Sequence, residues 1–230
     1  MLSRDPACAF VHIPKTGGSS IELLLTGHDW ITGSPEEYAT YRAERHRYRS
    51  DWGGTLCDGD SGYFTRHLAR KHASQARLRE ELGPEAWRST FKFTFVRNPW
   101  ERLLSIFDHG HRDGPERMPA SLGEWLAAEE PLDHMGQPVL QPLIDNWDEL
   151  DFVGRFEHFA EDFARVARAL GLSGAAARLP HERHGSRGPH DLTRYDERSI
   201  ALVARRCAEE IARFGYRFEG TPAPAGHPPT

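Results

Sequence analysis

Cysteine is scarce in this chain of 230 residues, which holds only Cys8, Cys57 and Cys207. Because the number is odd and the three lie far apart, a disulfide framework is disfavoured and a reducing compartment is indicated. Long hydrophobic runs are lacking too, so no segment approaches the length of a membrane span. The first residues show no signal-peptide pattern, and we therefore expect a cytoplasmic protein without a transmembrane segment.

An excess of positive charge is also lacking. The chain carries 29 Lys and Arg against 34 Asp and Glu, a formal net charge of −5. This balance argues against a nucleic-acid partner, although a local basic pocket can exist inside an acidic protein. The length and the 38% hydrophobic content fit one domain, expected over residues 1–219. Residues 220–230 contain several prolines and are expected to form a disordered tail.

Strand-like and helix-like segments alternate along the chain. Strands are predicted at about residues 7–13, 91–96 and 151–156, each followed by a helix. This alternation predicts an α/β fold with a central parallel sheet flanked by helices. Three further predictions concern the connections and the end of the chain: an irregular insertion over 27–66, a polar loop over 109–120 and a last helix over 196–213.

The first chemistry-bearing segment is a strand, a turn and a helix start. An apolar run from Ala9 ends at Pro14, and Lys15, two glycines and several hydroxyls follow up to Ser20. Such a turn points backbone N–H groups and the positive end of a helix dipole at one spot, which suits an oxyanion. From the residues alone, a glycine turn with a solvated lysine is the alternative.

The turn lacks the Walker A pattern, in which four residues separate the first glycine from Gly-Lys-Ser/Thr. Here Lys15 comes before Gly17 and Gly18 instead of after them. An ordinary ATP or GTP site is therefore disfavoured, and a nucleotide or small-molecule kinase with a degenerate loop stays as the alternative function. Lys15 can still reach a phosphate or bridging oxygen while the glycines let the backbone close around the anion.

A second motif begins where the predicted strand 91–96 ends. Arg97 follows the strand, Asn98 can cap the next helix, and Ser105 lies on that helix. An arginine at the carboxyl end of a strand is placed for bidentate phosphate contact, although it can instead pair with a carboxylate. For Arg102, solvation or a salt bridge in the core explains the residue as well as a functional role does.

Together the two motifs resemble those of sulfotransferases that use 3′-phosphoadenosine 5′-phosphosulfate (PAPS). Pro14–Ser20 is similar to that family's 5′-phosphosulfate loop, and Val96–Ser105 is similar to its 3′-phosphate motif. The stretches 151–157 and 211–216 are similar to the branch that contains carbohydrate O-sulfotransferases and many bacterial homologues. The resemblance covers about residues 7–218.

The resemblance implies a P-loop-like, three-layer fold and in-line sulfuryl transfer from PAPS to an acceptor hydroxyl, with 3′,5′-ADP as product. It makes carbohydrate the expected acceptor. No metal is expected to be required, and the sequence shows no Asp-rich Mg²⁺ pattern. Lys15 is placed to stabilise negative charge on the bridging oxygen of the leaving nucleotide. By the same resemblance the 5′-phosphosulfate is held by Lys15, Thr16, Gly17, Gly18, Ser19 and Ser20, and the 3′-phosphate by Arg97 and Ser105.

The acceptor must lose a proton, so a general base is needed. His72 precedes Ser74, the expected N-cap of a helix, and the resembling branch has a Lys-His pair at this place. His72 is therefore the expected base, with a structural role at the helix start as the alternative and His67 as the next candidate. His12 is expected to be structural because it lies inside the first strand.

A histidine-rich and arginine-rich loop near residue 183 resembles a family segment that usually has asparagine where this chain has Arg183. Ser186 and Arg187 in this loop are expected to close over the nucleotide. Arg187 would then assist in binding the 3′-phosphate.

Overall fold

The computed structural model describes residues 2–4, 7–18, 20–21, 55–57, 64–66, 72–134, 136–172 and 191–218. The chain divides into two compact units. The first consists of Met1–Val96 and Pro142–His184, and the second of Arg97–Gln141 and Gly185–Thr230. The described strands belong to the first unit, whereas the named elements described in the second unit are helices. Among the described helices, none is long and apolar enough to cross a lipid bilayer.

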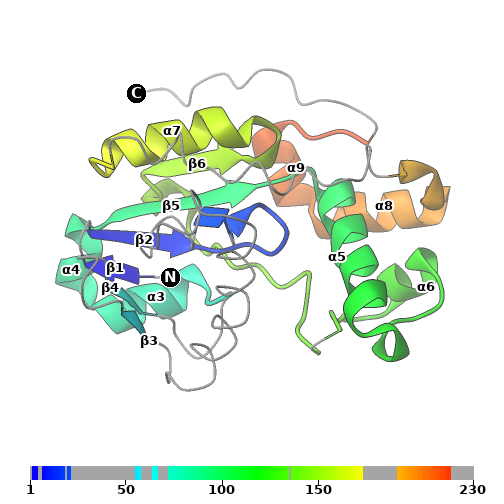
Figure 1. Cartoon of the computed structure of the whole chain (residues 1–230). Helices are drawn as coiled ribbons and strands as arrows, with labels where there is room; N and C mark the ends of the chain where they lie inside the picture. The colour runs from blue at the N-terminus through cyan, green and yellow to red at the C-terminus, as the bar shows by residue number, and fades with distance from the viewer. Residues whose placement is uncertain are drawn as a thin grey trace, which may run out of the picture. The chain divides into compact units, whose positions relative to one another are not determined.

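The first unit contains a six-stranded sheet in the order β3-β4-β1-β2-β5-β6 (Figure 1). Its central part is parallel: β2 pairs with β5 and β5 pairs with β6, which places Phe10, Phe93 and Phe152 in register. This parallel sheet confirms the predicted fold class. The strands are β1 (Leu2–Arg4), β2 (Ala7–Val11), β3 (Thr55–Cys57), β4 (Phe64–Arg66), β5 (Phe91–Val96) and β6 (Phe152–Arg155).

The remaining strands are antiparallel. β1 pairs with β2 and with β4, and β3 pairs with β4. The prediction of an irregular insertion over 27–66 was therefore wrong at residues 55–57 and 64–66; the other residues of that segment lie outside the described ones. Strands of three residues are too short to show a period in the sequence, so local patterns do not reveal them.

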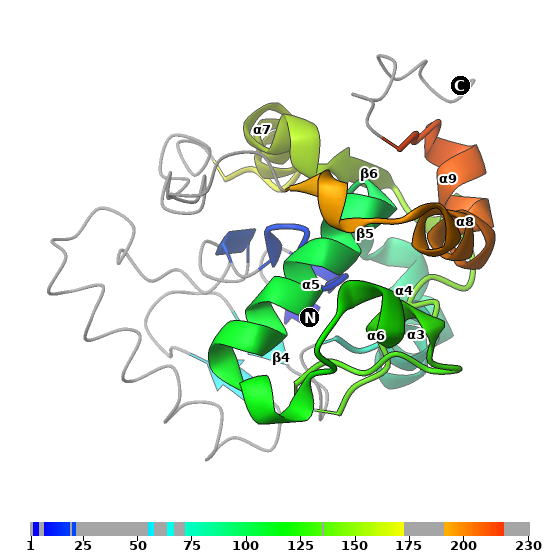
Figure 2. The ribbon, with the colours of Figure 1, turned by 90° about the vertical axis from the view of Figure 1, so that its right-hand side faces the viewer.

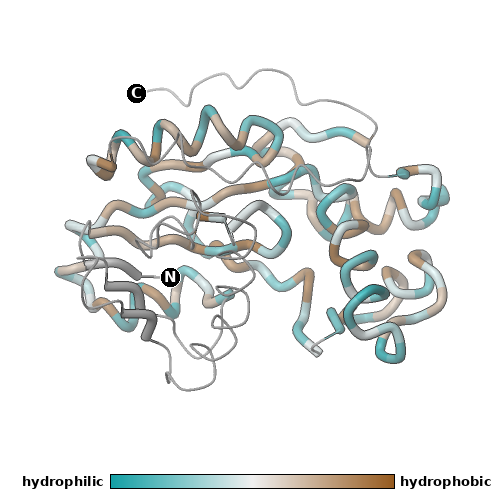
Figure 3. The backbone as a smooth tube through the Cα atoms, in the orientation of Figure 1, coloured by the Kyte–Doolittle hydropathy of each residue, from teal (hydrophilic) through white to brown (hydrophobic). Residues whose placement is uncertain are grey.

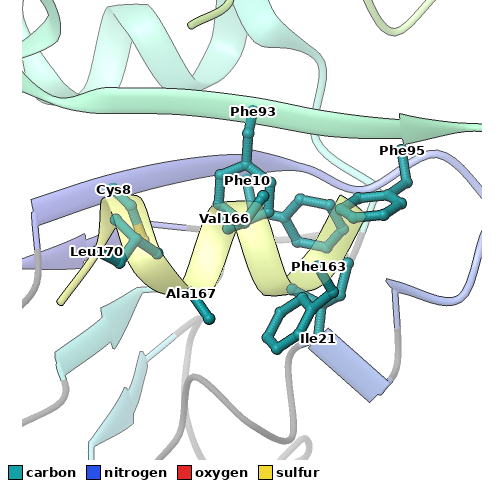
Figure 4. Close-up of a cluster of buried hydrophobic side chains, with 9 residues drawn as sticks. All are labelled: Cys8, Phe10, Ile21, Phe93, Phe95, Phe163, Val166, Ala167 and Leu170. Atoms are coloured by element: carbon teal, nitrogen blue, oxygen red, sulfur yellow. The ribbon is translucent and has the colours of Figure 1, made fainter. Parts of the chain in front are cut away.

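Helices cover both faces of this sheet. Phe10, Phe93 and Phe95 project from one face and are fully buried against α7 (Phe159–Ala169), as Figure 4 shows. Lys92 projects from the opposite face because side chains alternate along a strand. Its Nζ donates to the carbonyl oxygen of Trp87 on α4 (Pro84–Ser89). The predicted three layers are thus present, and Figure 3 shows hydrophobic residues concentrated along β2 and β5.

The second unit is built around α5 (Pro99–Asp113), which Figure 2 shows beside α6 (Leu122–Ala127). Asn98 caps α5 as expected: its Oδ1 accepts a hydrogen bond from the Trp100 N–H at 3.1 Å. Leu103 and Phe107 are among the buried side chains on the apolar face of α5. The unit is completed by η2 (Pro115–Arg117), η7 (Leu192–Arg194), α8 (Glu197–Arg206) and α9 (Ala208–Phe214).

Two predictions about this unit were wrong in their boundaries. The polar loop expected over 109–120 starts later, because α5 continues through His109 to Asp113. The last helix, expected over 196–213, is interrupted at Cys207 and forms α8 and α9. In both cases the polar or mixed composition gives no clear helical period, so the helix bounds cannot be read from the sequence. Packing within the unit determines them.

Candidate functional site

The turn after β2 is held by short-range hydrogen bonds. Thr16 is fully buried, and its Oγ1 donates to the carbonyl oxygen of Ile13 at 2.8 Å. The N–H of Ser20 donates to the carbonyl oxygen of Gly17 at 2.9 Å, and residues 18, 20 and 21 are helical. Lys15 has φ +64°, a left-handed conformation that is uncommon for residues other than glycine. The chain therefore reverses sharply between the strand and the helix.

Both glycines of the turn are required by their surroundings. Gly17 has φ +85°, and a Cβ atom added to it would lie 2.6 Å from the ring of Phe159 at the start of α7. A Cβ atom on Gly18 would lie 2.2 Å from the imidazole of His12. No side chain fits either gap without displacement of a ring. The turn is thus a close-packed loop, and Lys15 within it is half-buried.

Such a loop suits an anion for a physical reason. Where a tight turn leads into a helix, backbone N–H groups without intrahelical partners point outward at the positive end of the helix dipole. A lysine and several hydroxyls beside these groups add charge and further donors. The loop of the first unit has this composition, with Lys15, Thr16 and Ser20 among its described residues.

His72 is attached to the strand that leads into this loop. Its Nδ1 lies 2.7 Å from the carbonyl oxygen of His12, and the two imidazole centroids are 4.5 Å apart. Because a carbonyl oxygen can only accept, Nδ1 carries the proton, and Nε2 is the basic nitrogen of the neutral ring. His12 itself is 2% exposed and stacks on Phe10, as expected for a structural residue.

The start of α3 (Gln75–Leu82) keeps His72 in place. Ser74 is its N-cap, as expected, and accepts from the N–H of Arg77 at 3.3 Å. The side chain of Gln75 is fully buried, where it accepts from the N–H groups of Asp145 and Asn146. These bonds anchor the segment three residues after His72, so the imidazole is attached at a fixed point of the first unit.

The second motif belongs to the second unit. Arg97 follows β5 directly and is 6% exposed, with Nη2 3.2 Å from Oε2 of Glu101. The pairing with a carboxylate that the sequence left open for Arg97 is therefore present. Ser105 is half-buried on α5, four residues after Glu101, so Glu101 and Ser105 lie on one face of the helix. Glu101 therefore has Arg97 as its ion-pair partner and Ser105 one turn further along the helix.

Arg102 has a structural role. Of the explanations that the sequence left open for it, the salt bridge in the core is the one observed. Nη2 of Arg102 lies 3.0 Å from Oε2 of Glu210 on α9, and the two side chains are 7% and 14% exposed. The pair is a salt bridge in the core of the second unit. Arg102 therefore joins α5 to α9.

Four expected site residues lie outside the described ones: Ser19, His67, Ser186 and Arg187. Sequence reasoning in turn missed Phe159, whose ring sets the size limit at Gly17. No local signal could have found it, because Phe159 and Gly17 are brought together only by the packing of α7 on the sheet.

A family model described as the sulfotransferase family matches residues 1–217. No curated protein and no solved structure matches the chain.

Proposed function

The chain belongs to the sulfotransferase family, and from this premise we propose that it transfers a sulfuryl group from PAPS to a hydroxyl of a carbohydrate acceptor. The family match extends over residues of both units, which supports one sulfotransferase domain over residues 1–219. The observation that carries the proposal is the loop after β2. Phe159 and His12 leave no room for a side chain at its two glycines. Its lysine precedes these glycines, whereas in a Walker A loop the lysine follows them.

In this proposal the loop binds the 5′-phosphosulfate. Thr16, Gly17, Gly18 and Ser19 offer N–H groups to its oxygens, and Ser19 and Ser20 offer hydroxyls. The hydroxyl of Thr16 and the N–H of Ser20 instead hold the turn together, through their bonds to Ile13 and Gly17. Lys15 stabilises the negative charge that grows on the bridging oxygen as the sulfur–oxygen bond to the nucleotide breaks. A lysine before the glycines, instead of after them, suits this role at the leaving group.

His72 is the proposed general base. Nε2 takes the proton of the acceptor hydroxyl while that oxygen forms its new bond to sulfur. The hydrogen bond from Nδ1 to the His12 carbonyl oxygen supports the assignment, because it fixes the tautomer in which Nε2 can accept.

Arg97 and Ser105 are proposed to bind the 3′-phosphate, with Ser186 and Arg187 closing over the nucleotide. The burial of Arg97 supports a guanidinium held in a set direction, which the phosphate would share with the carboxylate of Glu101. A 3′-phosphate contact would distinguish PAPS from ATP, because ATP carries no phosphate at that position.

A thermal-shift series with 3′,5′-ADP, AMP and ATP with Mg²⁺ tests the nucleotide assignment. We expect 3′,5′-ADP to stabilise the protein most. Preference for ATP with Mg²⁺ would instead support the kinase alternative. A screen of hydroxylated acceptors with PAPS, read by mass for sulfuryl addition, then tests the transfer. Lys15→Ala should abolish it, and near-normal activity of that variant would contradict the role of Lys15.

A further inference from the structure

Three metal-binding side chains meet at the carboxyl end of α5. His109 and Asp113 are four residues apart and therefore lie on one face of the helix. His134 comes from the segment after α6, and one ligand atom from each of the three lies within 4.8 Å of the others. All three belong to the second unit, so one compact body places them together.

His134 is held at a tight turn. The N–H of Asp133 donates to the carbonyl oxygen of Gln137, and the N–H of Gly136 donates to that of Asp133, both at 2.9 Å. The carbonyl oxygen of His134 accepts from Arg117 at 3.2 Å. A Cβ atom on Gly114, just after α5, would lie 3.2 Å from the His134 Cβ. The backbone thus brings this turn close against the helix end.

The two imidazoles are in contact with each other. Their centroids are 5.0 Å apart with an interplanar angle of 76°, so the edge of one ring meets the face of the other. Nδ1 of His134 is buried and has no hydrogen-bond partner among the described residues. A buried ring nitrogen without a partner is unusual and calls for a ligand or an ion.

Arg112 contacts two of the three side chains. Its guanidinium contacts Nδ1 of His109, and its Nε lies 2.7 Å from Oδ1 of Asp113. Nδ1 of His109 and Oδ2 of Asp113 are 3.0 Å apart. Ligands of a tetrahedral Zn²⁺ ion lie about 3.4 Å apart, so this pair is already near the required separation. The side chain of Arg112 is half-exposed and can turn into solvent.

We propose that His109, Asp113 and His134 bind a divalent transition metal of the Zn²⁺ class, which fastens the turn at residues 133–137 to the end of α5. Two imidazoles and one carboxylate form a donor set that Zn²⁺ accepts, with water completing the tetrahedron. Mg²⁺ and Ca²⁺ prefer oxygen ligands and are not expected to bind. The metal takes the position that the Arg112 guanidinium occupies, so the two compete. The role is independent of sulfuryl transfer.

Calorimetric titration of the EDTA-treated full chain with Zn²⁺, and visible absorption with Co²⁺, test this site. We expect one equivalent to bind, and a Co²⁺ spectrum typical of tetrahedral coordination. His134→Ala and Asp113→Asn should each weaken binding more than about tenfold. Arg112→Gln should tighten it because the competing cation is gone. The exposed His158→Ala is the matched control and should bind like the wild type.

Circular dichroism of each variant shows whether it folds, and Asp113→Asn retains the shape of the side chain in case His134→Ala does not fold. Wild-type protein that binds no Zn²⁺ would overturn the proposal. Unchanged affinity in a folded Asp113→Asn or His134→Ala variant would place the metal elsewhere and would overturn it too. Neither result touches the nucleotide assignment, which the 3′,5′-ADP shift tests separately.

Discussion

The imidazole of His12 stands so close to Gly18 that a Cβ atom on the glycine would lie 2.2 Å from the ring. The ring is buried and stacks on Phe10 at a centroid distance of 5.4 Å, so it has little room to move away. The sequence places the glycine in the loop and the histidine in the strand. Their contact makes the glycine a packing requirement, whereas at Gly17 the positive φ adds a conformational one.

Gly18→Ala should therefore destabilise the protein by about 1–3 kcal/mol through overpacking, and should weaken 3′,5′-ADP binding. Urea unfolding and a binding titration measure the two effects. Gly123→Ala on α6 is the matched control, because no atom lies within 4 Å of the added carbon. It should be neutral or stabilising by up to about 1 kcal/mol. Equal stability of the two variants would contradict the close contact.

His72→Asn separates the position of the imidazole from its basicity. The amide can still donate to the His12 carbonyl oxygen but cannot take a proton, so kcat should fall about 10²- to 10⁴-fold with little change in KM for PAPS. Steady-state kinetics checks this, with the exposed His158→Ala as control. If His72→Asn kept most of its kcat, the base would lie elsewhere, and His67→Ala would be the next variant.

Arg97→Ala should change nucleotide preference. Loss of a charge-assisted phosphate contact costs about 1.5–3 kcal/mol, or roughly 10- to 100-fold in the affinity for 3′,5′-ADP. The affinity for AMP should change little, because AMP has no 3′-phosphate. The exposed Arg88→Ala is the control. Equal losses for both nucleotides would remove Arg97 from the 3′-phosphate site.

The buried salt bridge between Arg102 and Glu210 predicts a large stability effect. Glu210→Ala leaves the guanidinium buried without this carboxylate and should cost about 3–5 kcal/mol in the free energy of unfolding. The neighbouring Glu209 is exposed, so Glu209→Ala should change stability by less than about 0.5 kcal/mol. Denaturant titration of both variants provides the comparison, and similar midpoints would refute the structural role of the pair.

Stability should fall at alkaline pH. Burial raises the pKa of the Cys207 thiol from 9.0 to about 11, and burial also raises the pKa of Tyr195. Because the folded-state pKa lies above the unfolded one, the contribution is complete below about pH 9 and is lost as the pH rises through about 11. For Cys207 it amounts to at most about 3 kcal/mol. Unfolding free energies across this range should fall less steeply in Cys207→Ala, and parallel curves would refute the assignment.

Local sequence signals predicted several elements well. The apolar run at Phe91–Val96 gave β5 with its observed bounds, and Ser74 and Asn98 cap α3 and α5 as expected. Strand periodicity and helix caps depend on residues within a few positions of each other, so the chain shows them without a fold. The strands β3 and β4 were not predicted, because pairing with neighbouring strands, and not their own three residues, stabilises them.

The sequence by itself determined the order of the motifs, the strand-loop-helix around Lys15 and the family. Only the tertiary structure decided that Phe159 limits the space at Gly17, that His12 holds the ring of His72 by its carbonyl oxygen, and that Arg102 joins Glu210. The reason is physical. A turn or a cap is encoded by its own residues, whereas the partner of a buried ring or charge depends on which distant segment packs beside it. The requirement for glycine at residue 18 therefore lies in a contact, not in the motif.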